Sequence, residues 1–361
     1  MDFGLSEDQQ LLKTTIGRFL AEQCPTTRVR EIMEGGTGHD ATLWTSLAEL
    51  GVAALPIPEA HGGLGADLLD LALAAEELGY AATPGPFLGA SMAAIGLAEG
   101  DNEELKARWL PQASAGSALG TIAIGEAESV WDPDAIAASV SDGKLSGRKP
   151  LVPYAAVSDF IVVAARDGEE TGLWLVEAGA AGMEITTLSG NDMSRRLDDV
   201  VFDQTPARRV GDGHALERCL DAGLILISAD AFGGARRCLE MTRDYSLERE
   251  QFGQPIGAFQ SYKHQLADIA AEVEPCMSLY WYAAHTFDAF PDQTSKHAAL
   301  AKLRIGEVFN DVAFKCTELH GGIGFTWEYD LQLWFRRALF DKAFLGEAVL
   351  HCDRVADMAG W

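Results

Sequence analysis

The sequence is short of cysteine pairs, of basic residues and of long hydrophobic runs. Its six cysteines include no C-x-x-C pair, and a chain of 361 residues is far longer than a disulfide-stabilised scaffold. No stretch approaches the roughly 18 consecutive apolar residues of a membrane-spanning helix. Residues 1–6 also lack the basic segment that begins a signal peptide. We therefore expect a cytoplasmic protein with reduced thiols and no membrane partner.

Positive charge is scarce, because 28 Lys and Arg stand against 54 Asp and Glu and the net charge is -26. Such a chain repels phosphate backbones and anionic lipid at long range, so nucleic acid is not an expected partner. An anionic substrate would need a local basic patch. The residues available for one include four arginine doublets: Arg195 with Arg196, Arg208 with Arg209, Arg236 with Arg237, and Arg336 with Arg337.

The overall amino-acid composition is that of a folded protein. Hydrophobic residues make up 48% and charged residues 23%, as in ordinary globular domains. The N-terminal third has the periodicity of amphipathic helices, beginning with a capping-box pattern at Ser6 and Gln9. Similar periodicity returns in three later segments, at residues 43–50, 68–78 and 91–97. We expect residues 1–115 to form a helical lobe.

Short β-favouring runs replace this pattern after residue 115. Turn residues separate six of them, at 121–124, 135–140, 160–165, 173–176, 184–188 and 199–202. Asp142 and Gly143 are a hairpin signal, because glycine accepts the positive φ that a two-residue turn requires. We expect residues 116–210 to form a small, mostly antiparallel β lobe.

Helical periodicity dominates again towards the C-terminus. Four long segments carry apolar stripes, at residues 216–245, 258–290, 295–319 and 329–358. Long antiparallel helices of this kind pack as a bundle, and any apolar face left over is available for self-association. The expected fold is mainly α with a β insert: a helical lobe, an antiparallel β lobe and a C-terminal four-helix bundle over residues 211–361.

Three motifs occur in order along these lobes. Residues 58–65 read Pro-Glu-Ala-His-Gly-Gly-Leu-Gly, and residues 245–253 read Tyr-Ser-Leu-Glu-Arg-Glu-Gln-Phe-Gly. Residues 318–325 read Glu-Leu-His-Gly-Gly-Ile-Gly-Phe. With the order of the lobes, these motifs make essentially the whole chain resemble the acyl-CoA dehydrogenase family. The resemblance implies an FAD-dependent oxidoreductase that acts on an acyl-CoA thioester and passes electrons to an electron-transfer flavoprotein or a similar acceptor.

Two turns of the bundle carry the residues that the resemblance assigns to FAD. In the family, one subunit uses them to bind the cofactor of its neighbour; here they are Arg249, Gln251, Phe252, Gln260, Glu318, Gly321 and Gly322. A guanidinium can bond two oxygens of a diphosphate in one plane, and glycines leave backbone N–H groups open to an anion. Singly, such residues also occur as solvated helix ends or helix stops. Glu318 departs from the family, which usually has Gln there.

The family's catalytic base is missing at both of its usual positions. Family members remove the α proton of the acyl group with a Glu carboxylate, which must lie within hydrogen-bond reach of that proton. The resemblance puts Leu345 at the common position and Gly223 at the alternative one, and neither accepts a proton. Glu347 and Asp221 are the nearest acids, but each lies two residues away, roughly 200° around a helix.

The β lobe departs from the family where it would hold the flavin ring. The family's Thr-Glu-Pro and Gly-Ser-Asp run is replaced at residues 125–132, and its Lys-x-Trp-Ile-Thr-Asn run reads Lys-Pro-Leu-Val-Pro-Tyr at residues 149–154. Proline also removes an N–H that could meet the ring. These losses, beside residues for a neighbour's cofactor, predict a subunit of an α2β2 enzyme that shares FAD at an interface. The partner would be a second acyl-CoA dehydrogenase-like subunit that carries the base.

Three functions stay open at this point. The first is the base-lacking subunit of a heteromeric acyl-CoA dehydrogenase, a class that the resemblance links to bulky thioesters such as those of steroid side chains. The second is a self-sufficient homotetramer that uses Glu347 or another acid. The third is a flavin-free binding or scaffold protein on the same fold, which would have no use for Arg249, Gln251, Phe252 and Gln260. We predict no metal site.

Overall fold

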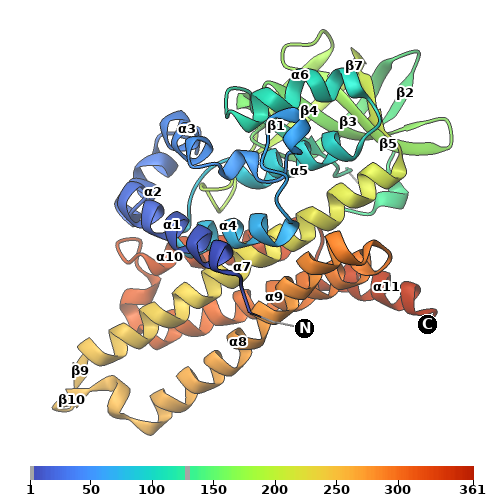
Figure 1. Ribbon diagram of the computed structural model, residues 1–361. Coiled ribbons are helices and arrows are strands. Elements are labelled where there is room, and N and C mark those ends of the chain that lie inside the picture. The colour runs from blue at the N-terminus through green and yellow to red at the C-terminus, as the bar shows by residue number, and fades with distance from the viewer. Residues whose placement is uncertain (1–3, 127–130) are drawn as a thin grey trace.

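A computed structural model of the chain describes residues 4–126 and 131–361. Figure 1 shows helices at both ends of the sequence and a β-sheet between them, which confirms the expected fold class. The sheet lies at one end of the molecule, and the long C-terminal helices extend away from it as an arm. The expected division of the chain into three lobes, after residues 115 and 210, remains a proposal. The first boundary falls just ahead of the sheet, and the second falls within the sheet's last strand, residues 208–211.

Within the described residues, six α-helices precede the sheet: α1 (Glu7–Gln23), α2 (Thr26–Glu34), α3 (Ala41–Glu49), α4 (Leu68–Tyr80), α5 (Phe87–Glu99) and α6 (Glu103–Ser114). The capping box is confirmed, because Ser6 Oγ accepts from the Gln9 backbone N–H and Gln9 Oε1 accepts from the Ser6 N–H, both at 3.1 Å. Periodicity did not identify α2 and α6. The first is short, and the second contains Pro111.

The eight-stranded sheet consists of β1 (Gly120–Ala123), β2 (Ser139–Ser141), β3 (Lys144–Pro153), β4 (Phe160–Asp167), β5 (Glu170–Glu177), β6 (Met183–Thr187), β7 (Leu197–Pro206) and β8 (Arg208–Gly211). Its order is β6-β7-β3-β2-β4-β5-β8, with β1 beside β4. The sheet is mostly antiparallel as expected, except that β1 and β2 each pair with β4 in parallel. The hairpin is confirmed, since Asp142 and Gly143 have φ of 50° and 71° between β2 and β3.

The C-terminal helices are α7 (Gly213–Glu248), α8 (Gln260–Ala289), α9 (Pro291–Leu319), α10 (Leu331–Ala343) and α11 (Ala348–Ala359). A small hairpin of β9 (Glu250–Gln251) and β10 (Gln254–Pro255) joins α7 to α8 at the far end of the arm (Figure 1). The prediction of one helix over residues 329–358 is wrong, because the chain turns a corner between α10 and α11. Among the residues described, no helix is long and apolar enough to cross a membrane.

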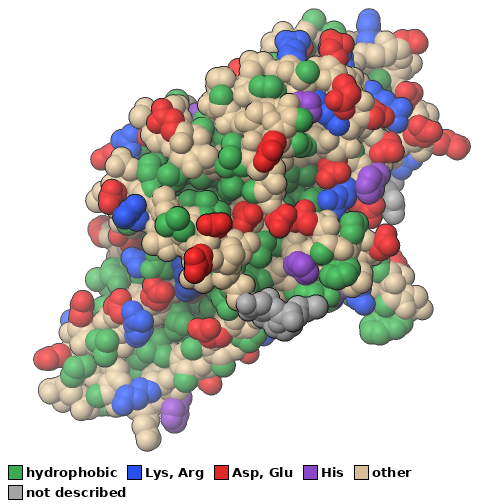
Figure 2. Space-filling view, viewed as in Figure 1, with side chains coloured by type: hydrophobic (Ala, Val, Ile, Leu, Met, Phe, Trp, Pro, Cys, Tyr) green, Lys and Arg blue, Asp and Glu red, His purple; other side chains and the backbone are tan. Residues whose placement is uncertain are grey.

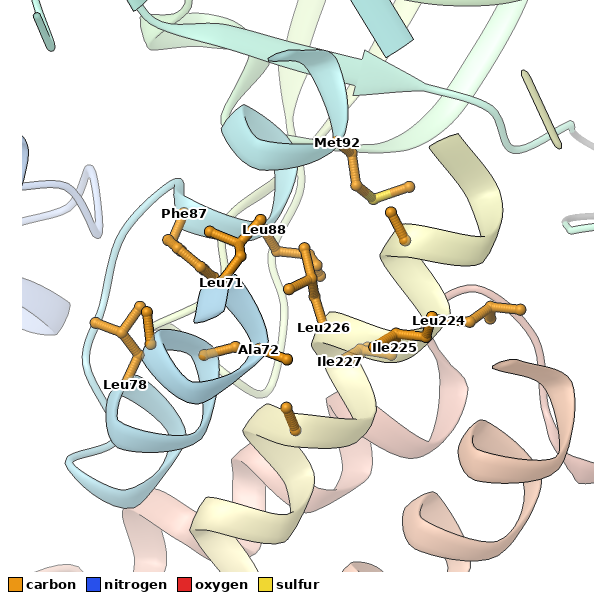
Figure 3. Packing of buried hydrophobic residues seen from close by; sticks show 14 of the residues in the cluster. Leu71, Ala72, Leu78, Phe87, Leu88, Met92, Leu224, Ile225, Leu226 and Ile227 are labelled. Carbon is orange, nitrogen blue, oxygen red and sulfur yellow. The ribbon is translucent and has the colours of Figure 1, made fainter. Parts of the chain in front are cut away.

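The core joins the N-terminal helices to α7. Figure 3 shows Leu71 and Leu78 of α4, Leu88 and Met92 of α5, and residues 224–227 of α7 packed together. Glycines allow α4 and α7 to cross closely. A Cβ on Gly79 would lie 2.0 Å from the carbonyl oxygen of Asp230, which leaves no room for any side chain.

A buried ionic network ties the sheet to the helices. Arg337 on α10 donates from Nη1 to Asp230 on α7 at 3.0 Å, and from Nη2 to the Thr83 carbonyl and the Ser194 hydroxyl, both at 2.9 Å. Arg195, from the loop before β7, bonds to the same Asp230 carboxylate. The two guanidiniums hold the pKa of Asp230 below its usual range against the opposing effect of burial. This network fixes the sheet relative to α7 and α10.

Candidate active site and cofactor surface

The two expected base positions lie against each other in the structure. A Cβ built on Gly223 would lie 3.0 Å from Leu345 Cδ1 and 2.5 Å from Met92 Cε. Leu345 is 3% exposed, and Met92 is fully buried. Figure 3 shows Met92 reaching from α5 towards α7. The space around both base positions is therefore filled with hydrocarbon, and neither position offers a proton acceptor.

The corner that carries Leu345 is held from α9. Leu345 has φ of +62° and Gly346 has φ of +105°, and a left-handed conformation is unfavourable for leucine unless its surroundings enforce it. Lys302 Nζ donates to the carbonyls of Asp341, Lys342 and Gly346 at 2.8–2.9 Å. Burial lowers the pKa of Lys302 to about 8. Lys302 thus satisfies the free carbonyls at the end of α10 and fixes the corner.

His351 on α11 holds the corner from the other side. Its ring is completely buried, and its Nε2 N–H donates to the Leu345 carbonyl at 3.1 Å. The other nitrogen, Nδ1, has no hydrogen-bond partner within the described ranges. Burial, helped by the charges of Lys302 and Arg354, lowers the pKa of His351 to about 4. Protonation would therefore bury a second N–H that has no acceptor.

We predict that His351 makes the fold sensitive to acid. In the unfolded chain, His351 takes up a proton near the ordinary pKa of about 6.5. In the folded chain, the pKa of His351 is about 4. The unfolded state thus holds more protons between these values, and lowering the pH through this window lowers the free energy of unfolding by on the order of 3 kcal/mol.

Urea denaturation at about pH 7 and about pH 4.5 tests this prediction against His351→Gln, which keeps a donor for the Leu345 carbonyl but does not titrate. The variant should lose less stability on acidification than the wild type, although other groups titrate in both. Equal losses in the two proteins would contradict it.

Neither neighbouring acid faces the filled position. Glu347 is exposed and stands at the N-cap of α11. The direction of the Glu347 side chain was expected from one continuous helix, and the chain does not form that helix here. The carboxylate of Glu347 nevertheless lies at the surface. Asp221 is buried on the continuous helix α7, two residues before Gly223 and so on another face. It accepts from Ser295 Oγ at 2.6 Å, and burial raises its pKa to about 6.

Residues 149–154, which stand where the family binds the flavin ring, are packed within the β lobe. Lys149 is fully buried, donates to the Ile124 carbonyl at 3.0 Å and pairs with Glu126. Leu151 stands where the family has its indole, with φ of +58° in an irregular stretch of β3. The other departure, at residues 125–132, lies partly outside the described residues, which omit 127–130.

Tyr154 closes the end of this run. Its hydroxyl accepts from the Gly85 N–H at 3.1 Å and donates to the Ser194 carbonyl at 2.6 Å. Pro153 and Tyr154 border a cavity of about 10 Å³, which is room for about one water. Pro153 and Tyr154 therefore leave no room for a flavin ring beside them.

The two turns that the resemblance assigns to FAD meet at one end of the bundle. The ring of Tyr245, near the end of α7, stacks on His320 after α9 with centroids 4.4 Å apart. Tyr262, near the start of α8, donates its hydroxyl to the Leu319 carbonyl at 3.1 Å. Contacts between aromatic side chains thus bring together segments that lie far apart in the sequence.

All seven residues assigned to FAD are exposed at this end: Arg249, Gln251, Phe252, Gln260, Glu318, Gly321 and Gly322. Phe252 is 93% exposed. The guanidinium of Arg249 has no hydrogen-bond or ion-pair partner in the described part of the chain. A Cβ on Gly321 or Gly322 would meet no atom within 4 Å, so packing inside this chain does not require these glycines, although the φ of +65° at Gly321 favours glycine there. Free donors around bare backbone are the kind of groups that bind a diphosphate.

Apolar side chains also remain uncovered on the arm. Figure 2 shows hydrophobic side chains between the charged ones where α7 and α8 extend from the body. The exposed large residues of the C-terminal helices and their turns include Leu247, Leu279, Tyr282, Phe314 and Phe325. Scattered apolar residues are normal, but several on one arm are typical of a surface that packs against another subunit.

Comparison with known proteins gives a consistent picture. Residues 6–117 match the acyl-CoA dehydrogenase N-terminal domain, and residues 211–359 match the C-terminal domain. Acyl-CoA dehydrogenase IpdE2 of Mycolicibacterium smegmatis is 34% identical over 344 residues, which cover 95% of this chain and 96% of that protein. A chain of the Tcur3481–Tcur3483 steroid ACAD has a TM-score of 0.92 at 30% identity and covers 98% of both chains. A chain of the ChsE4–ChsE5 complex from Mycobacterium tuberculosis has a TM-score of 0.91 at 25% identity, with 100% and 99% coverage.

Proposed function

The chain belongs to the acyl-CoA dehydrogenase family, and we propose that within it this protein is the base-lacking subunit of a heteromeric enzyme. The observation that carries the proposal is the packing of Leu345 and Met92 over Gly223, which leaves hydrocarbon where a carboxylate is needed. The similar Tcur3481–Tcur3483 and ChsE4–ChsE5 structures each pair two differently named chains, which supports a heteromer.

In this proposal the chain completes the FAD site of its partner. Arg249 binds the diphosphate, and the open backbone at Gly321 and Gly322 supplies N–H groups to it. Gln251, Phe252 and Gln260 cover the rest of the cofactor's nucleotide end, and Glu318 lies beside them. Bound FAD supplies the hydride acceptor of the reaction, and the partner subunit supplies the base that removes the α proton.

The proposed substrate is an acyl-CoA thioester with a bulky acyl group, such as a steroid side chain. This proposal is supported by the likeness to a steroid ACAD. The electron acceptor would be an electron-transfer flavoprotein or a similar protein. We also propose a cytoplasmic location, which the free state of the six cysteines supports.

Co-expression with an acyl-CoA dehydrogenase-like partner gene tests the proposal. The purified complex should contain both chains, oxidise an acyl-CoA thioester and bind about one FAD for each pair of chains, since only one of the two sites of a pair is complete. One FAD for every chain would favour the self-sufficient homotetramer. A complex without flavin or activity would favour the scaffold.

Glu347→Gln provides a sharper test of where the base lies. Because Glu347 is exposed at the N-cap of α11, outside the packed space around Gly223, turnover by the complex should stay nearly unchanged. Removing a true general base typically lowers the rate by about 10²- to 10⁴-fold. A loss of that size in the chemical step, with FAD retained, would identify Glu347 as the base.

A further inference from the structure

A second cavity, of about 230 Å³, lies between the loop before β7 and helix α10. Residues 188–193 and 195–197 form one wall, and Arg336, Leu339 and Phe340 form the other, with Leu151 at the edge. None of the seven residues assigned to FAD at the end of the bundle is among the described residues that line the cavity. Two of the arginine doublets in the sequence contribute to it, which leaves several cationic side chains around one small space.

Two of the charged groups in its walls are already neutralised. Arg195 bonds to Asp230 in the buried network. Asp192 accepts from both the N–H and the hydroxyl of Ser194, and its other oxygen lies 3.3 Å from Arg337 Nε. Asp192, the one carboxylate among the described residues that line the cavity, is therefore matched by a guanidinium outside it.

The other two cations, Arg196 and Arg336, have no counterion among the residues that the structure describes. Within residues 4–126 and 131–361, the guanidinium of Arg196 has no hydrogen-bond or ion-pair partner, and its Nε is buried. Arg336 donates from Nη1 to the Asn191 carbonyl at 2.9 Å and lies over the Trp327 ring, but its Nε is also buried and unbonded.

Two half-buried arginines without counterions are notable in a chain with a net charge of -26. A guanidinium charge without a counterion in a half-buried site is unfavourable, and an anion in the cavity would neutralise the charges of Arg196 and Arg336. Guanidiniums favour phosphate because their planar donors match pairs of its oxygens. The volume exceeds what a single water needs.

We propose that this cavity binds a phosphate group of a small molecule, as a monoester or as a diphosphate, between Arg196 and Arg336. The site is independent of the FAD contacts proposed above.

Isothermal titration of the purified full-length chain in phosphate-free, chloride-balanced buffer tests the site, with inorganic phosphate and pyrophosphate as separate probes. The wild type should bind with one-site stoichiometry. Arg196→Ala and Arg336→Ala should each weaken binding by roughly 10-fold or more, as expected for the loss of a charge-assisted hydrogen bond. Arg196→Lys should recover part of the affinity, because it keeps the charge without the planar contact.

Arg209→Ala is the matched control, since Arg209 is an exposed arginine on β8 away from the cavity and should bind as the wild type does. Tighter binding of pyrophosphate identifies a diphosphate ligand, and equal or weaker binding identifies a monoester. The absence of saturable binding, or wild-type affinity in both Arg196→Ala and Arg336→Ala, would overturn the proposal. Because the titration needs neither FAD nor a partner, its failure would leave the proposed function untouched.

Discussion

The chain purified without a partner subunit is expected to carry little or no FAD. Its own β lobe offers Leu151 and Pro153 where the family offers an indole and a hydroxyl, and Tyr154 is already bonded to Gly85 and Ser194. At Pro153 and Tyr154, a ring would have to displace packed side chains around a cavity of about 10 Å³. Each neutral hydrogen bond that is missing weakens binding by about 1 kcal/mol, before any penalty for moving these side chains.

The measurement is the flavin content of the isolated chain, read from its visible absorbance after incubation with excess FAD and dialysis. The co-expressed complex, treated in the same way, is the control and should retain its flavin. A yellow homotetramer with FAD in every chain would show that the β lobe accommodates the ring after all. That result would also favour the self-sufficient enzyme over the heteromer.

Arg249→Ala in the assembled complex is expected to weaken FAD binding by roughly 10- to 150-fold, although the ring should lie mainly against the partner. The side chain is exposed at the end of α7, and its guanidinium has no partner within the described residues of this chain. A cation that is held free at a subunit surface can make charge-assisted bonds to a diphosphate without first breaking others. Arg249→Lys should recover only part of the affinity, because an ammonium group lacks the planar two-point contact.

FAD is titrated into deflavinated complexes, and the flavin fluorescence reports binding. Arg243→Ala is a matched control on the same helix, because Arg243 is exposed and pairs with its neighbour Asp244. It should leave the affinity unchanged. Equal affinities for the wild type and Arg249→Ala would mean that Arg249 is an ordinary surface residue, and that this end of the bundle does not bind the cofactor.

The features that the sequence determined by itself are local ones. The capping box depends on Ser6 and Gln9, three residues apart, and the hairpin depends on adjacent residues that adopt positive φ at Asp142 and Gly143. The long helices α7, α8 and α9 follow from apolar residues at helical spacing. Each of these features depends on neighbours along the chain, so the order of residues suffices to predict it.

The family resemblance predicted more of the site than local patterns did, because matching motifs identify site positions that residue spacing alone does not. It assigned Leu345 and Gly223 to the base positions, and the structure then brought the two side by side. No pattern indicated Met92, which fills the same space from α5. Its position depends on how α5 packs against α7, and many apolar residues of the N-terminal helices would have been equal candidates in the sequence.

Only the tertiary structure decided the corner between α10 and α11. The apolar period continues through residues 344–347, so periodicity predicts one helix there. The chain turns instead because Lys302 on α9 bonds the free carbonyls at the end of α10 and His351 bonds the Leu345 carbonyl. A helix ends where its last carbonyls find other partners, and here one of those partners is a lysine that packing brings in from another helix.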